Sequence, residues 1–129
     1  MSDETTRRFG AAHKPVEIRL NRDARALEVD FDDGRSFDLS AEFLRVQSPS
    51  AEVRGHGAGE RRIVGGCRAV GIAAVEPVGN YAIRLIFDDG HDTGLYSWAY
   101  LYELGVNRDA LWQAYLDALA AKGLARDPA

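Results

Sequence analysis

The sequence predicts an α+β fold: an antiparallel sheet of hairpins, with short helices packed on one face and a C-terminal helix. Apolar and polar residues alternate in several short runs, which is typical of half-buried strands. Asp-Asp-Gly follows two of these runs, and Asp-Gly is a strong signal for a hairpin turn. A serine then precedes each of two short helical patterns, in the position of a helix cap.

The first half of the chain predicts two hairpins and a short helix. In 16–20 and again in 27–31, apolar side chains alternate with polar ones, as in a strand with one buried face. The tripeptide 32–34 forms a turn because glycine accepts positive φ, and 37–39 forms the return strand. Ser40 can accept a hydrogen bond from a free backbone N–H, so a short helix begins after it.

The second half predicts three more strands. Residues 70–78 form the first, with Pro77 near its end or on an edge because proline lacks the N–H donor. In 81–87, large apolar side chains occupy every second position, 88–90 repeat the Asp-Asp-Gly turn, and 93–96 form a short return strand.

Two helices follow these strands. Ser97 caps a short aromatic helix over 98–104, and Gly105 is expected to stop it. Asn107 is expected to cap the last helix, which ends at Gly123. Apolar side chains fall on one face of that helix at helical spacing and predict a core-facing stripe: Leu111, Trp112, Tyr115, Leu116 and Leu119.

The two halves resemble each other. Phe-Asp-Asp-Gly occurs at 31–34 and at 87–90, and each copy has two strands before it, then a short strand and a capped helix. Either one unit is duplicated, or two hairpins independently need an Asp-Gly turn. Both alternatives lead to the same architecture, a layer of helices against an antiparallel sheet.

Composition excludes several classes of protein. A chain of 129 residues fits one domain and can bury a core without disulfides. The net charge of −4 and pI near 5.3 argue against nucleic acid as a partner. The single cysteine, Cys67, suits a reducing compartment. Without a signal peptide or an apolar run of roughly 18 residues, the sequence predicts a cytoplasmic protein with no membrane contact.

No pattern in the chain predicts a catalytic centre. The acidic pairs 32–33 and 88–89 are explained by turns, where aspartates bond the local backbone. No Gly-x-Ser-x-Gly elbow surrounds a serine. Cys67 beside Arg68 is better explained as a structural thiol. The glycine-rich segment 55–66 lacks a phosphate-binding motif and predicts a mobile, exposed loop whose role stays open.

Histidines offer the alternative of a ligand site. His56 and His91 could meet in space near Asp89 or Asp92, and would then bind a metal or a small ligand. Their spacing does not demand this, and an exposed or core-bonded histidine is the other interpretation of each.

Several segments together resemble the gamma-butyrobetaine hydroxylase-like N-terminal domain family. The resemblance extends from about Pro15 to Leu104, and its most specific part is the second half. It rests on the following segments: Leu44–Val53, Gly79–Ala82, Asp89–His91 and Gly94–Trp98. With it, we expect a flexible arm over 1–14, the family domain over 15–106, and a C-terminal helix and tail over 107–129.

The resemblance implies a zinc site and iron-related partners. In eukaryotic hydroxylases of the family, the domain precedes an iron- and 2-oxoglutarate-dependent oxygenase domain and holds zinc through three cysteines and a histidine. Other members stand alone, often in bacteria, or are joined to a P-loop iron–sulfur carrier in plants. Here the cysteine positions fall on Ser48, Ser50 and Val53, and only His91 matches a ligand.

These substitutions predict that the chain lacks the family's zinc, since hydroxyls are poor zinc ligands and valine offers none. Zinc or iron would follow only from family analogy, and no cofactor is expected. We therefore expect a non-catalytic accessory module that binds a protein partner, linked to iron–sulfur or iron/2-oxoglutarate oxygenase proteins. The expected ligand or partner surface contains His56, His91, Tyr96 and Trp98, and the alternative is a metal- or small-ligand-binding protein using His56 and His91. The oligomeric state is left open.

Overall fold

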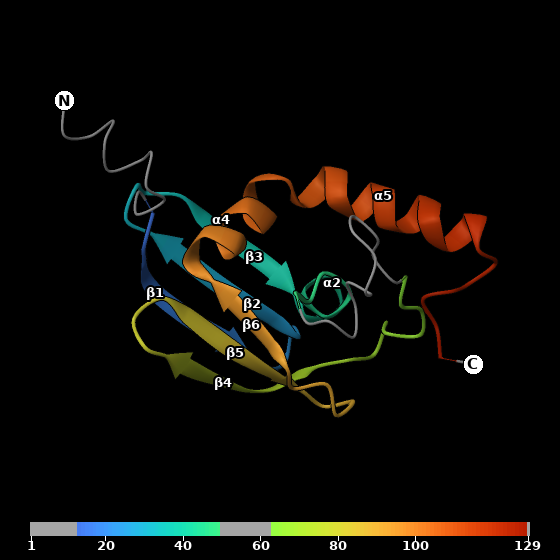
Figure 1. The fold of residues 1–129 in the computed structure, drawn as a ribbon, viewed down its shortest axis with the longest axis horizontal. Coiled ribbons are helices and arrows are strands. Elements are labelled where there is room, and N and C mark those ends of the chain that lie inside the picture. Colours follow the sequence, from blue (N-terminus) through green and yellow to red (C-terminus); the bar gives the residue numbers. More distant parts are fainter. Residues whose placement is uncertain (1–12, 50–62, 129) are drawn as a thin grey trace.

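The computed structural model describes residues 13–49 and 63–128. Its elements, in chain order, form two similar β-β-β-α units and a last helix (Figure 1). The first unit contains β1 (Pro15–Asn21), β2 (Ala26–Phe31), β3 (Ser36–Ser40) and α2 (Ala41–Val46). The second contains β4 (Ile72–Val78), β5 (Ala82–Phe87), β6 (Gly94–Ser97) and α4 (Trp98–Val106), and α5 (Arg108–Ala121) follows it.

Each unit has its own antiparallel three-stranded sheet, with the orders β1-β2-β3 and β4-β5-β6. Each Asp-Asp-Gly turn works as its sequence predicts, because Gly34 and Gly90 have φ values of +90° and +94°. Pro77 lies on the edge strand β4, where its missing N–H breaks no ladder. The α+β prediction is confirmed, with the sheet divided in two.

The helices cover one side of the sheets and close a single core (Figure 1). Both units contribute to this core, whose large, fully buried side chains include Leu27, Leu39, Phe43, Leu44, Leu85, Phe87, Tyr96, Leu101 and Leu104. Ser40 and Ser97 cap α2 and α4, accepting hydrogen bonds from the N–H groups of Phe43 and Tyr100 at 3.1 Å. These caps confirm the predicted helix starts.

The last helix also belongs to the core. Tyr115 and Leu119 are buried, and Leu111, Trp112 and Leu116 pack against the same cluster, so the predicted stripe is core-facing. Beyond α5, the tail pairs with an earlier segment: the N–H groups of Gly66 and Arg68 donate to the carbonyls of Ala125 and Arg126 at 2.9 and 3.0 Å.

Two predictions at the end of α4 are wrong. The helix does not stop at Gly105 but continues to Val106. Gly105 is needed for a close approach instead, since a Cβ there would lie 2.3 Å from Cγ of Phe37. Asn107 does not cap α5 with its side chain; its Nδ2 donates backwards to the carbonyl of Glu103 at 3.0 Å.

Among the helices that the structure describes, none is long and apolar enough to cross a membrane. His56, Ser50 and Val53 lie outside the described residues, as do most of the glycine-rich loop and of the predicted arm.

Candidate functional site

The candidate site lies where the end of α2 meets the turn between β5 and β6. Ser48, just beyond α2, and His91, in the turn, are joined by a hydrogen bond of 2.9 Å between Oγ and Nε2. Ser48 is 0% exposed and His91 is 6% exposed, so the pair is buried. The sequence marked both residues as candidates through the family resemblance, but only the fold brings them together.

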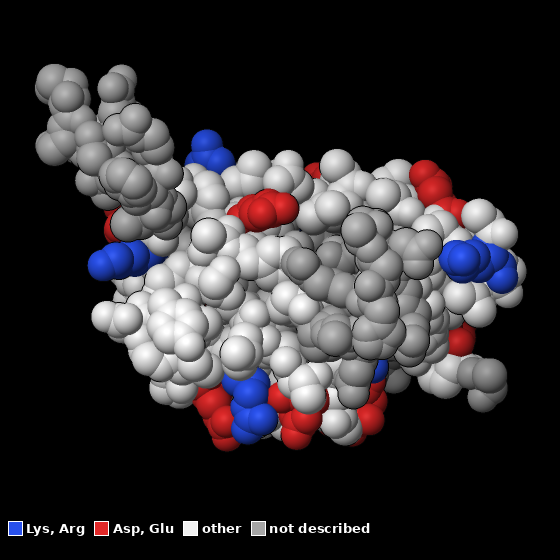
Figure 2. Space-filling view, in the orientation of Figure 1, with Lys and Arg blue, Asp and Glu red and all other residues white. Residues whose placement is uncertain are grey.

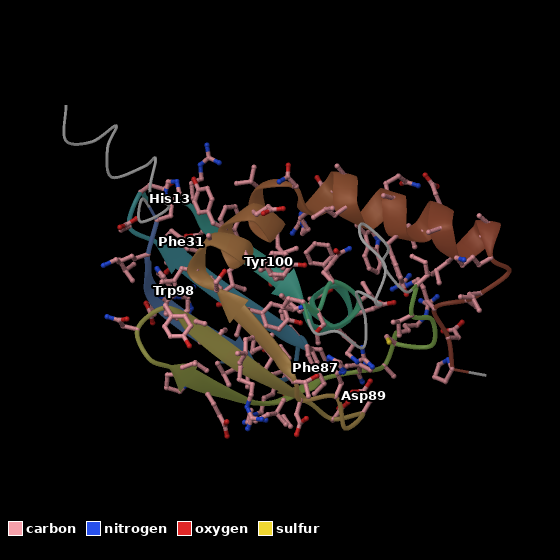
Figure 3. All side chains as sticks on the ribbon, viewed as in Figure 1. His13, Phe31, Phe87, Asp89, Trp98 and Tyr100 are labelled. Atoms are coloured by element: carbon pink, nitrogen blue, oxygen red, sulfur yellow. The ribbon has the colours of Figure 1, made fainter. Side chains whose placement is uncertain are left out.

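The turn itself is held by Asp89. One carboxylate oxygen, Oδ1, accepts from the backbone N–H of His91 at 3.1 Å, which closes the turn locally. The other, Oδ2, accepts from Nε of Arg45 at 2.8 Å, and this bond links the turn to α2. Figure 3 shows Asp89 beside Phe87 at the end of β5. The predicted turn role of this aspartate is confirmed, and the contact to α2 adds to it.

Two tyrosines hold the end of α2 from the other unit. The hydroxyl of Tyr96 donates to the carbonyl of Leu44, and that of Tyr100 donates to the carbonyl of Gln47. These bonds satisfy carbonyl groups that the last turn of a helix leaves without intrahelical partners. Gly94 makes room for the neighbouring serine, because a Cβ there would lie 2.7 Å from Oγ of Ser48.

The arrangement of Ser48, His91 and Asp89 stabilises the fold and does not form a nucleophile and base that substrate could reach. A serine nucleophile needs a base and also access to substrate, and the Ser48 hydroxyl is fully buried. The carboxylate of Asp89, which could orient a catalytic imidazole, instead binds the backbone N–H of His91 and the guanidinium of Arg45. The pair thus ties two segments together rather than presenting a reactive group.

The donor set also does not fit the zinc centre that the family resemblance implies. Structural zinc takes four ligands, usually thiolates and imidazoles. Ser48 supplies a neutral hydroxyl that is bonded to the imidazole of His91. Within 13–49 and 63–128, no three histidine, cysteine or carboxylate side chains come together as a group that could hold a metal ion.

Cys67 lies near this site but is not activated. Its side chain is buried and its thiol donates weakly to the carbonyl of Gly65 at 3.6 Å. Burial raises the pKa of the thiol, an effect that the nearby charge of Arg45 only partly opposes. A raised pKa leaves less of the nucleophilic thiolate, which supports the structural interpretation of this cysteine.

The predicted aromatic surface is only partly exposed. Tyr96 is 0% exposed, so its inclusion in a partner surface was wrong: it alternates with the exposed Leu95 and faces the core. Trp98 is half-buried, and its Nε1 donates to the carbonyl of Asn80 at 2.7 Å. Sequence reasoning missed its neighbour Tyr81, which is 57% exposed after the Gly-Asn turn. That turn was the available signal, because strand ends beside turns often expose their side chains.

An aromatic cluster at the other Asp-Asp-Gly turn was also missed. His13, expected in the arm, stacks on Tyr102 with 3.8 Å between ring centroids. The Tyr102 hydroxyl donates to Oδ2 of Asp33 at 2.6 Å. This bond, and a second one from the backbone N–H of Arg35, lower the pKa of the Asp33 carboxyl. The same bond raises the pKa of Tyr102.

Comparisons with known proteins agree with this architecture. Two proteins with NMR solution structures share 49% and 52% identity with the chain, with TM-scores of 0.80 and 0.77. The first match covers 91% of this chain and 92% of the other, and the second covers 89% and 86%. A DUF971-family protein of unknown function from Acidithiobacillus ferrooxidans shares 41% identity, with a TM-score of 0.61 over 71% of this chain and 92% of its own.

A comparison with curated proteins found no significant match. The family described as "Gamma-butyrobetaine hydroxylase-like, N-terminal" matches residues 18–102, which include all strands except the start of β1, together with α2, most of α4, and the pair Ser48 and His91. The chain therefore belongs to the gamma-butyrobetaine hydroxylase-like N-terminal domain family.

Proposed function

We propose that this domain is a non-catalytic accessory module that binds a protein partner through a surface formed by Tyr81 and Trp98. The observation that supports the proposal is the exposure of Tyr81 beside the half-buried Trp98, on two adjacent segments, the β4–β5 turn and the start of α4. Tyrosine and tryptophan, with arginine, are enriched among the few residues that contribute most of the binding energy of protein interfaces. We call these two residues, with Asn80 between the segments, the Tyr81–Trp98 surface.

The Tyr81–Trp98 surface is held in place before any partner arrives. The backbone N–H of Trp98 donates to the carbonyl of Tyr81 at 3.1 Å, and its indole donates to Asn80 at 2.7 Å. The Tyr81 ring also packs over Gly79, where a Cβ would lie 2.9 Å from Cε2. Side chains fixed in this way lose little conformational entropy on binding.

The surroundings support a docking role. Trp98 lies at the end of the molecule opposite the C-terminus (Figures 1 and 3). In Figure 2 the lower part of that end is white, which marks residues other than Lys, Arg, Asp and Glu, and blue side chains lie above it. Interfaces have such a composition at their centre, where charged residues are depleted and aromatic residues enriched.

The family resemblance supports a proposal for the partner's class. Related domains occur with an iron- and 2-oxoglutarate-dependent oxygenase or with an iron–sulfur carrier, so we propose an iron-handling or redox protein as the partner. The alternative of a ligand site with His56 and His91 has less support, because His91 is buried and bonded to Ser48.

The test is quantitative capture with matched surface variants. The wild-type protein and Tyr81→Ala are immobilised, captured proteins are identified, and the affinity of a reproducible partner is then measured in purified form. Loss of a hot-spot aromatic weakens binding at least roughly tenfold. Leu124→Ala is the control, since Leu124 is also exposed (43%) but lies beyond α5.

Trp98→Phe adds a milder variant that keeps an aromatic ring but removes the indole donor. Equal affinity of wild type, Tyr81→Ala and Trp98→Phe for every captured protein would rule out this surface as the docking site.

A further inference from the structure

We infer that the hydrogen bond between Ser48 and His91 is a metal-free clasp, which fixes the end of α2 to the β5–β6 turn in place of a bound zinc ion. The inference concerns the interior of the domain and does not depend on the proposed partner surface. It identifies this chain as a member of the family that needs no metal to fold.

The distance and burial of Ser48 and His91 show a buried hydrogen bond between them. Oγ of Ser48 and Nε2 of His91 are 2.9 Å apart, an ordinary hydrogen-bond distance, and both residues are buried. A buried polar group that is not bonded destabilises the fold, so each of these two groups satisfies the other. Nε2 of His91, one of the two imidazole nitrogens that can bind a metal, is thus bonded to the serine.

Further hydrogen bonds hold the end of α2, so the clasp does not act alone. The end of α2 is also tied to the second unit by Arg45 to Asp89, by Tyr96 to Leu44, and by Tyr100 to Gln47. These bonds come from side chains distributed over β6, α4 and the turn. Together they fix the end of α2, directly before Ser48, the first of the family's ligand positions.

Gly94 leaves the space in which the clasp forms. Its missing side chain leaves the space that the Ser48 hydroxyl occupies, since a Cβ at Gly94 would lie 2.7 Å from that oxygen. The site is thus fitted around a hydrogen-bonded hydroxyl. Gly94→Ala should displace Ser48 from His91 and weaken the clasp without removing either partner.

The test begins with metal content and thermal unfolding of the purified full chain. We expect no bound zinc by elemental analysis, and the same melting temperature with EDTA, with added zinc and with neither. Ser48→Ala should lower the melting temperature by about 3–10 °C, because it leaves the imidazole of His91 without its serine partner. Zinc in near-stoichiometric amount that disappears in His91→Ala, or a melting temperature lowered by EDTA, would overturn the inference.

A double-mutant cycle separates the clasp from general packing. If Ser48 and His91 act through each other, Ser48→Ala combined with His91→Phe should cost less than the sum of the two single changes. Additive losses would contradict a clasp. The control is Ser97→Ala with His91→Phe, because Ser97 caps α4 through Tyr100 and should add its effect independently.

Restoring the family's ligands sharpens the test. Ser48→Cys, Ser50→Cys and Val53→Cys together should create a site that takes up zinc, and His91→Ala in the same background should abolish uptake. Absence of uptake by a folded triple variant, or uptake that survives the loss of His91, would show that His91 does not occupy a ligand position. Neither result would bear on partner binding through Tyr81.

Discussion

The two Asp-Asp-Gly turns have the same local structure but close against different partners. In both, the second aspartate accepts a hydrogen bond from the N–H two residues ahead, from Arg35 at 3.0 Å in one turn and from His91 at 3.1 Å in the other. Figure 3 places Phe31 and His13 near one end of the sheets, and Phe87 and Asp89 near their opposite end. The shared sequence therefore determines the local turn, and the surroundings determine which side chains close against it.

Each turn is closed by the helix of the other unit. Tyr102 of α4 donates to Asp33, and Arg45 of α2 donates to Asp89. Both donors lie five residues beyond the serine that caps their helix (102 − 97 and 45 − 40). The two units thus hold each other through equivalent positions, and the repeated sequence corresponds to a repeated structural role.

The two units differ at the positions that follow their helix caps and at those that precede them. Eight residues beyond each cap, the first unit has Ser48 and the second has Gly105 (48 − 40 and 105 − 97). Three residues before each cap, Phe37 faces Gly105, and Gly94 faces Ser48. An aromatic ring fills one position, and a hydroxyl bonded to His91 fills the other. One scaffold therefore presents an apolar contact at one end and a polar site at the other.

The largest expected effect tests the apolar contact. Gly105→Ala would place a Cβ 2.3 Å from the Phe37 ring, so the ring must move. We expect a loss of about 1–3 kcal/mol in the free energy of unfolding, measured by urea denaturation. Phe37→Leu in the same background should recover part of the loss. A fully stable Gly105→Ala protein would show that the close approach is not required.

An intermediate effect on the melting temperature is expected from replacing the second aspartate of each turn. Asp89→Ala leaves the guanidinium of Arg45, whose side chain is only 14% exposed, without its carboxylate. Asp33→Ala removes a bond to a tyrosine hydroxyl on the surface. Asp89→Ala should therefore lower the melting temperature more than Asp33→Ala. Equal losses would mean that the two turns contribute alike despite their different partners.

The smallest effect is the acid response of the first turn. The pKa of Asp33 is lowered, first by the Tyr102 hydroxyl and then by the Arg35 N–H, so ionised Asp33 stabilises the folded state. This stability is present above the unfolded pKa of about 3.9 and is lost as pH falls through the lower folded value. Tyr102→Phe should reduce that loss in urea denaturation between about pH 5 and 2. An unchanged pH profile would argue against the Tyr102–Asp33 bond.

Local signals in the sequence predicted most of the fold. Strand alternation, the two Asp-Gly turns and the caps Ser40 and Ser97 each depend on residues close together in the chain, and each is present in the structure. Gly105 was misinterpreted because its reason is remote: the Phe37 ring comes from the other unit. A glycine near a predicted helix end looks the same whether it stops the helix or admits a neighbour.

The candidate site was harder to predict from the sequence than the fold. The resemblance marked Ser48 and His91 as aligned positions, but their hydrogen bond spans 43 residues and exists only after the units have docked. Tyr96 was placed on a surface because its aromatic neighbours drew attention, although the alternation of β6 puts it opposite the exposed Leu95. Tyr81 was passed over as a strand residue, since exposure at a strand end depends on what covers the turn.

The separation of the sheets has a kinetic consequence. Every strand pairs with its neighbour in the chain, so each sheet can form by closing short loops, which costs little entropy. The bonds between units join residues far apart, such as Tyr96 and Leu44, separated by 52 positions. Contacts of this kind slow folding, because the intervening chain must be ordered first. We therefore expect the contacts between the two units, rather than strand pairing within each sheet, to limit the rate of refolding.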